Sequence, residues 1–259
     1  MFTMNSVSIS VIRGIPEIRE GDPLTEILAE AIKSDGTSLR DGDILCIAHK
    51  IISKAEGRII HLTDVIPSEN ALYYARKLKK DPRKVEVILR ESREVLRYFR
   101  HEHQNEGVII CENNLGFISA NAGVDESNLE KENTVLMLPE NPDLSAQNIK
   151  KFFKKKQNVS VGIVITDTFG RPWRIGQVNV AIGIAGVPVT QSEKGQPDNF
   201  GRIMKVTEPA FCDEIAAASG LVIKKSEKTP LVIFRGLEWK NCSGGAKDIL
   251  RNKKEDMFL

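Results

Sequence analysis

The sequence has little of several features that often reveal a protein's surroundings. Its 37 lysines and arginines nearly balance its 35 aspartates and glutamates, and the net charge is +2. So small an excess creates no broad field for nucleic acid or an anionic membrane, so any bound anion is held locally. Cysteines are few, lie far apart and form no C-x-x-C pair: Cys46, Cys111, Cys212 and Cys242. We therefore expect free thiols, no disulfide framework, no zinc ribbon and no nucleic-acid partner.

Long apolar runs are also missing. No stretch approaches the roughly 20 apolar residues that a membrane-spanning helix needs. Residues 1–14 lack the basic start and continuous apolar core of a secretory leader. We expect a cytoplasmic protein without a membrane partner. Its 259 residues suffice for one large domain, or two interlocked smaller ones, with a substantial core.

The common phosphate-binding motifs are absent as well. Nothing in the sequence matches G-x-x-x-x-G-K-[ST]. The segment AIGIAGV, residues 181–187, lacks the third glycine of a dinucleotide-binding turn. Any phosphate chemistry must therefore use a different kind of phosphate-binding segment.

Strand and helix patterns are mixed throughout the chain. Apolar runs bounded by turn residues predict strands within residues 6–14, 44–48, 161–166 and 230–236. Segments with helical spacing of apolar residues lie between these predicted strands. The mixture predicts an α+β fold.

Apolar residues at helical spacing predict the helices. They occur over residues 24–31 and 206–222, and in a lysine-rich segment that follows a Ser145 cap. The pair Asp-Pro at 81–82 is typical of a helix start, and the apolar stripe behind it continues to Phe99. We expect one helix over that whole stretch.

One polar cluster is ANAGVDESN, residues 120–128. Asn121, Asp125 and Asn128 offer oxygen and amide groups around a bend that glycine permits, and hard cations prefer such ligands. The alternative is an Asx-rich turn whose side chains bond only their own backbone. For the isolated segment the turn is the simpler interpretation.

A second polar cluster follows the strand at 161–166. Asp167 and Thr168 are expected to leave the strand together, offering a carboxylate and a hydroxyl to Mg²⁺ or Mn²⁺. Arg171 and Arg174 carry forked, permanently charged donors that suit phosphate or carboxylate. The alternative is a capped turn with arginines in surface ion pairs.

A third cluster, residues 48–58, places Lys50, Ser53, Lys54 and Arg58 just after a buried strand. Lysines there suit a triphosphate as mobile point charges, although lysines are ordinarily surface charges. Together the three clusters imply a hard divalent cation, a polyanion and a carboxylate. That set suits phosphoryl transfer and leaves the acceptor open.

The clusters also occur in an order that resembles one family. The segments that carry this resemblance run from about residue 11 to about residue 240: GIPEI, KIISKAEGR, NAGVDESN, TDTFGRPWRIGQ, AIGIAG, VTEPAFCDEIAAA and PLVIFRGL. They resemble the coenzyme F420-0:γ-glutamyl ligase family, in its stand-alone type without a C-terminal nitroreductase-like domain. The resemblance implies one ligase-like domain over residues 1–259, made of two interleaved subdomains, and an interwoven homodimer.

The resemblance further implies a GTP-dependent ligase that adds L-glutamate to the deazaflavin precursor F420-0. The γ-phosphate of GTP would activate a terminal carboxylate as an acyl phosphate, which the glutamate amine then attacks. Mg²⁺ or Mn²⁺, two ions per site, would neutralise the phosphate charges. K⁺ is a further candidate cofactor.

Site residues follow from the resemblance position by position. Asp125 and Asp167 are expected to bind metal, with Thr168 on the second ion, and Asn128 to contact GTP. The other expected nucleotide contacts are Ile15, Pro16, Glu17, Ile18, His49, Lys50 and Lys54. We give catalytic roles to the two aspartates and, from the chemistry of the residues alone, to Arg171 and Arg174 as balancing cations.

Two places depart from the family's pattern. His49 stands where relatives more usually carry glutamine or a small hydroxyl residue, which alters a nucleotide contact. Residues 222–230 contain no glycine, although the family's segment there wraps GTP, so close backbone approach to phosphate is harder to arrange. The side chains that could compensate are Lys224, Lys225 and Glu227.

Two alternatives stay open. The altered segment at 222–230 leaves room for an amide ligase with another acceptor, amino acid or nucleotide. The other alternative is a non-catalytic paralogue that binds nucleotide or deazaflavin, against which the presence of Lys54, Asp125, Asp167 and Thr168 argues. The sequence does not predict how many glutamates are added.

Overall fold

Helices and strands alternate along the chain. The computed structural model describes residues 6–224 and 227–256. The helices are α1 (Leu24–Ser34), α2 (His49–Ala55), α3 (Glu69–Leu78), α4 (Pro82–Arg90), α5 (Pro142–Gln157) and α6 (Phe211–Ser219). The strands are β1 (Ser8–Ile12), β2 (Ile44–Ala48), β3 (Ile59–His61), β4 (Ser92–Phe99), β5 (Val108–Asn113), β6 (Ile118–Ala120), β7 (Thr134–Leu136), β8 (Gly162–Arg171), β9 (Arg174–Ala185) and β10 (Leu231–Arg235). The α+β class predicted from the sequence is confirmed.

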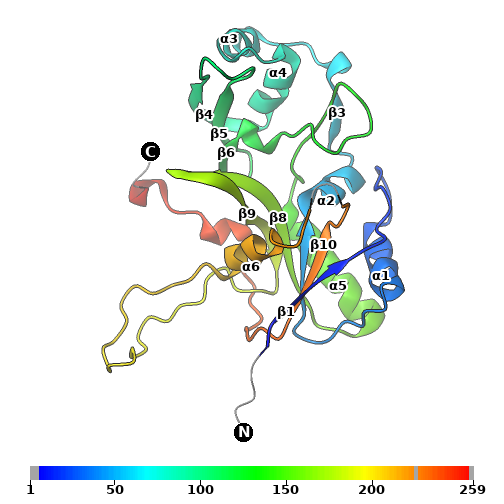
Figure 1. The fold of residues 1–259 in the computed structure, drawn as a ribbon, viewed down its shortest axis with the longest axis vertical. Coiled ribbons are helices and arrows are strands. Elements are labelled where there is room, and N and C mark those ends of the chain that lie inside the picture. The colour runs from blue at the N-terminus through cyan, green and yellow to red at the C-terminus, as the bar shows by residue number, and fades with distance from the viewer. Residues whose placement is uncertain (1–5, 225–226, 257–259) are drawn as a thin grey trace.

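The main sheet has five strands in the order β1-β10-β2-β8-β9. β2 and β8 run parallel, whereas the other neighbouring pairs in this sheet are antiparallel. Consecutive side chains of β2 and of the first half of β8 are buried, so both faces of the sheet are covered there. Helices α5 and α6 pack against β8 and β9 (Figure 1). Because the carboxyl ends of parallel strands share one edge, Ala48 and Thr166 lie side by side.

A second group of elements lies beyond the main sheet, at the top of Figure 1. It consists of the sheet β4-β5-β6 with helices α3 and α4. Its buried side chains, among them Leu78, Ile88 and Ile109, form a hydrophobic cluster of their own. The main sheet contributes Leu45 and Ile163 to a separate, larger cluster. The division into two interleaved subdomains stays a prediction.

The helix predicted after Asp81 is right at its start and wrong at its end. Asp81 caps α4 and accepts a hydrogen bond from the Arg83 amide at 2.8 Å. The helix ends at Arg90, and residues 92–99 form β4, which pairs antiparallel with β5. Over residues 92–99 the apolar side chains fit the helical period as well as the strand period. Pairing with β5 makes this segment a strand.

Two other helix boundaries also differ from the prediction. Asn141, and not Ser145, caps α5, because Asn141 Oδ1 accepts a hydrogen bond from the Leu144 amide at 3.1 Å. Helix α6 is shorter than the predicted range of 206–222. Within the described ranges, no helix is both long enough and apolar enough to cross a membrane.

Candidate functional site

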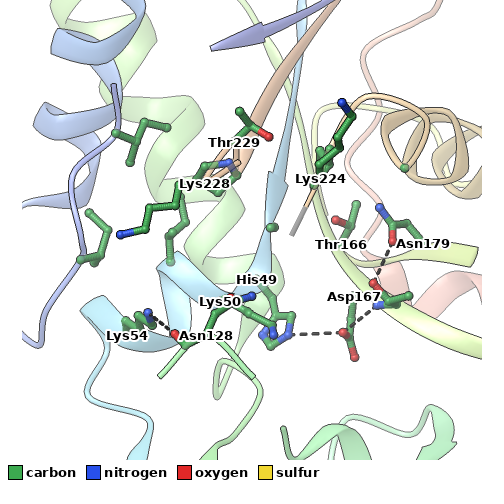
Figure 2. A pocket seen from close by; sticks show the side chains of 18 of the residues that line it. His49, Lys50, Lys54, Asn128, Thr166, Asp167, Asn179, Lys224, Lys228 and Thr229 are labelled. Atoms are coloured by element: carbon green, nitrogen blue, oxygen red, sulfur yellow. Dashed lines mark hydrogen bonds and ion pairs between the residues drawn. The ribbon is translucent and has the colours of Figure 1, made fainter. Parts of the chain in front are cut away.

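A cavity of about 770 Å³ lies at the carboxyl edge of the β2–β8 pair (Figure 2). Its walls come from segments that are far apart in the sequence, including the early loop, the start of α2 and the base of the β8–β9 hairpin. Most of the predicted site residues line it: Ile15, Pro16, Glu17, Ile18, His49, Lys50, Lys54, Asn128, Asp167 and Thr168. The parallel strand pair explains this convergence, since it delivers the segments after β2 and β8 to one place.

Two lysines of α2 point from one helix face toward the turn at residues 125–128. α2 begins directly after β2, and Lys50 and Lys54 are one helical turn apart. Lys50 Nζ lies 2.5 Å from Asp125 Oδ2 and 2.6 Å from Ser127 Oγ. Lys54 Nζ donates to the Asn128 carbonyl at 2.8 Å. The lysines predicted as phosphate ligands therefore also position the polar turn.

Glu17 brings the early loop into the same network. Its carboxylate forms an ion pair with Lys54, whose side chain is only 9% exposed. The second oxygen of Glu17 lies 3.9 Å from Lys228 Nζ. Glu17 thus lies between two cationic groups of the cavity wall.

Asp125 lies at the margin of the cavity and does not line it. One of its oxygens accepts a hydrogen bond from the Ser127 amide at 2.9 Å. This is the bonding expected if residues 120–128 form an Asx-rich turn. Burial opposes ionisation of this carboxyl, but the hydrogen bonds and charge of Lys50 and the bonds from Ser127 outweigh it and lower its pKa to about 2. Asp125 is therefore a carboxylate under ordinary conditions.

Asp167 and Thr168 stay within β8 and do not leave the strand together as predicted. They pair across the hairpin with Val180 and Asn179 of β9. The Asp167 side chain is 15% exposed, and its Oδ1 lies 3.3 Å from His49 Nε2. Thr168 Oγ1 donates to Asn179 Oδ1 at 2.9 Å. Backbone pairing and these side-chain contacts hold the acid and the hydroxyl at the cavity wall.

Arg171 and Arg174 are placed away from the cavity. Both are exposed at the tip of the β8–β9 hairpin, and neither lines the cavity wall. Arg171 Nη2 donates to the Ile175 carbonyl at 2.6 Å. The structure thus does not bring the two predicted arginines together with the acid and the lysines.

Sequence reasoning missed the polar residues that β9 supplies. Gln177 and Asn179 line the cavity, and Asn179 pairs with Thr168 across the hairpin. They are two positions apart in a strand, so their side chains share one face. Polar residues at alternating positions ahead of an apolar run were the signal that could have found them.

The glycine-free segment at 222–230 does form part of the cavity wall. Ile223, Lys224, Lys228 and Thr229 line it, and Lys225 falls outside the described residues. Lys228 adopts a φ of 51°, a left-handed conformation that glycine adopts more easily. The expected difficulty of bringing this backbone close to phosphate stays a prediction.

The charges of the cavity divide into two kinds. The positive charges are lysines: α2 supplies Lys50 and Lys54, and the segment after α6 supplies Lys224 and Lys228. The acids that line the cavity are Glu17, Glu130 and Asp167. Such a mixed lining suits a polyanion together with a cation.

The fold and the cavity define an α+β protein with a cavity, lined by lysines and acids, at the carboxyl edge of its parallel strand pair. The family model of F420-0:Gamma-glutamyl ligase matches residues 13–236. Among similar proteins, the coenzyme F420:L-glutamate ligase of Methanothermobacter thermautotrophicus is 39% identical over 97% of this chain and 98% of its own length. That of Methanopyrus kandleri is 43% identical over 93% of each chain. The chain therefore belongs to the F420-0:γ-glutamyl ligase family.

Proposed function

We propose that this protein is a GTP- and divalent-metal-dependent ligase that adds L-glutamate to F420-0, in the cytoplasm. The observation that carries the proposal is the cavity that gathers lysines, acids and a hydroxyl at the carboxyl edge of β2 and β8. The names of the similar proteins support the substrates glutamate and F420. The cavity's volume of about 770 Å³ suits ligands of the size of a nucleotide.

The proposed reaction has two steps. A carboxylate oxygen of F420-0 bonds to the γ-phosphorus of GTP, and the bond from that phosphorus to its bridging oxygen breaks, with the electron pair leaving on GDP. The glutamate amine nitrogen then bonds to the carbonyl carbon of the acyl phosphate. Inorganic phosphate leaves with its bonding electrons, and the nitrogen loses a proton. Activation is needed because a carboxylate is itself a poor acyl donor.

Lysines of the cavity stabilise the negative charge that this transfer carries. Lys50 and Lys54 are held in place by Asp125 and Glu17, so they are positioned before the nucleotide arrives. A phosphate group can replace the Glu17 carboxylate beside Lys54, since both are anionic oxygen acceptors. The loop Ile15–Ile18 and Asn128 then bind the rest of the nucleotide.

Asp167 and Thr168, with Asp125 nearby, are the residues that would hold Mg²⁺ or Mn²⁺, two ions per site, with K⁺ as a further candidate. The second carboxylate oxygen of Asp167 takes part in no hydrogen bond among the described residues. Across the described ranges, no group of three or more His, Cys, Asp or Glu side chains is placed to hold an ion. Water and substrate oxygens would complete the coordination, as is usual for Mg²⁺. A bound ion would neutralise phosphate charge.

We also propose a homodimer. Residues 190–209 form a long arm that extends from the body, drawn in yellow in Figure 1. Backbone hydrogen bonds across the arm, such as Glu193 to Thr207 and Met204 to Gln196, give it a defined shape. Yet Phe200 is 89% exposed. Exposed apolar side chains on an ordered arm favour cover by a second copy of the chain.

An assay of the product tests the proposed activity. The protein is incubated with F420-0, L-glutamate, GTP and Mn²⁺, and F420-0 is followed by mass spectrometry, with no-metal and ATP controls. We expect a mass gain of one or more glutamyl units that requires both GTP and metal. No gain with the folded protein in the complete mixture would contradict the proposal.

The lysine-bearing segment at 222–230 motivates a second candidate, an amide ligase with another nucleotide, acceptor or amino acid. Lys224 and Lys228 add positive charge to the cavity wall. A substrate panel with the same readout separates the two activities. Turnover of another acceptor in place of F420-0 would favour the second candidate.

A further inference from the structure

His49 is a buried histidine of the cavity wall, with both ring nitrogens close to polar groups. The residue is 2% exposed and begins α2, and its ring points toward Asp167 of β8 (Figure 2). Its Nδ1 lies 3.1 Å from Ser53 Oγ, one helical turn along α2. Its Nε2 lies 3.3 Å from Asp167 Oδ1. The ring therefore links the helix that carries the lysines to the strand that carries the acid.

The contact between Nε2 and Asp167 is not an ordinary hydrogen bond. The two atoms are close enough for an ion pair, yet Nε2 is a buried atom that has no hydrogen-bond partner among the described residues. Native proteins rarely leave a buried polar atom unpaired, so such an atom calls for an explanation. Both residues line the cavity.

The spacing and chemistry of the pair suit two ligands of one metal ion. Two donors that each lie about 2.1 Å from an ion, at angles of roughly 90–110°, are about 3.0–3.4 Å apart. The 3.3 Å between Nε2 and Oδ1 falls within that range. A ligating imidazole usually has its other nitrogen hydrogen-bonded, which fixes the ring and its tautomer. Ser53 Oγ makes that contact here.

We propose that His49 Nε2 and Asp167 together bind one divalent transition-metal ion, and that this site prefers Mn²⁺ to Mg²⁺. With its proton on Nδ1, the imidazole presents the Nε2 lone pair, a good ligand for transition metals, whereas Mg²⁺ demands oxygen. The inference rests on the proposed function, which makes Asp167 a metal ligand, and adds a nitrogen ligand and a metal preference. The competing explanation is that Nε2–H only orients Asp167.

Electron spin-echo spectroscopy of the full chain loaded with Mn²⁺ alone tests the nitrogen ligand, because it detects nitrogen nuclei bonded to the ion. We expect ¹⁴N coupling in the unaltered protein, a change to ¹⁵N coupling after labelling with ¹⁵N-histidine, and loss of the coupling in His49→Gln. The chain's other histidines, His61, His101 and His103, are exposed. His61→Gln is therefore the matched control and should keep the coupling.

Calorimetry with each metal alone tests the preference. We expect His49→Gln to weaken Mn²⁺ binding about tenfold or more and Mg²⁺ binding less than about twofold. The labelled, unsubstituted protein keeps the inference testable even if His49→Gln fails to fold.

Two results would overturn the inference in different ways. Mn²⁺ binding without any histidine nitrogen coupling would remove His49 as a ligand and leave the metal-dependent ligase intact. Absence of Mn²⁺ binding, with or without GTP, would remove both the inference and the metal requirement of the proposed function.

Discussion

Lys54 shows how one side chain holds two walls of the cavity together. Its amino group lies between Glu17 of the early loop and the Asn128 carbonyl of the polar turn. An amino group positioned by two acceptors loses less freedom when a phosphate binds than a mobile lysine does. In the proposed function, the contacts that join the two walls also position this amino group for an anion.

Loss of the Lys54 charge should weaken nucleotide binding. Charge-assisted hydrogen bonds contribute about 1.5–3 kcal/mol, so we expect Lys54→Met to lower GTP affinity by about tenfold or more. Fluorescence titration with a labelled GTP analogue measures the change. Lys33→Met, at an exposed lysine of α1, is the control and should bind as the unaltered protein does. Unchanged affinity in a folded Lys54→Met protein would contradict this role.

Buried thiols should be unreactive in the folded protein. Burial raises the pKa of Cys46 and of Cys212 to about 12, and it also raises the pKa of Cys111. Because the thiolate is the reactive form, we expect Ellman's reagent at pH 8 to modify Cys242 alone. All four cysteines should react in guanidinium chloride. Rapid modification of a second thiol in the native protein would show that the core is more open than described.

At the scale of elements, the cap of α4 is a sequence signal that the structure confirms. Asp81 accepts hydrogen bonds from both the amide and the side chain of Arg83. We expect Asp81→Ala to cost about 1 kcal/mol of unfolding free energy, the usual value of an N-cap. Urea denaturation measures the loss, and Asp64→Ala, at an exposed aspartate, is the control. Equal stability of the Asp81 and Asp64 variants would argue against the cap.

The stabilisation by Asp81 should also depend on pH. Its bonds with Arg83, opposed in part by burial, hold the pKa of Asp81 below its usual 3.8 in the folded protein. A carboxyl with a lowered folded pKa stabilises the protein above its unfolded pKa and ceases to do so as the pH falls through the folded value. The difference between the unaltered protein and Asp81→Ala should therefore shrink below about pH 4. A difference that grows in acid would contradict this sign.

Local signals predicted elements well and their ends less well. Caps and apolar periods located the starts of α4 and the buried strands, because these depend on neighbouring residues. Residues 92–99 were expected to be helical and form β4, because the partner that decides their conformation is β5, a contact the local pattern does not contain. Asp167 likewise stays in β8 because β9 pairs with it.

In the candidate site, too, local sequence signals could be recognised, whereas contacts between distant segments could not. The lysines of α2 and Asp167 could be placed near strand ends from the sequence, and the family resemblance linked them to the early loop. Gln177 and Asn179 were missed because their approach depends on hairpin register. Arg171 and Arg174 lie along the hairpin beyond the cavity, because the strand continues where a turn was expected.

At the scale of the whole molecule, the arm at 190–209 should hold two copies of the chain together. We expect light scattering after gel filtration to give about twice the chain mass of 28.8 kDa. Phe200→Ser with Val206→Ser removes two apolar side chains that are 89% and 83% exposed and should yield monomers. Ile66→Ser, also at an exposed apolar residue, is the control and should stay dimeric. A dimer that survives the double substitution would place the interface elsewhere.

The measurement that tests the account most directly is GDP release by Asp167→Asn in the presence of F420-0, L-glutamate, GTP and Mn²⁺. Asp167 lines the cavity with the lysines, so a ligase that works at this site should lose about a hundredfold or more of its turnover when the carboxylate is removed. Asp64→Asn should keep full turnover, and GDP release by the unaltered protein should require both F420-0 and glutamate. Full turnover by a folded Asp167→Asn protein would contradict the claim that ligation takes place in this cavity.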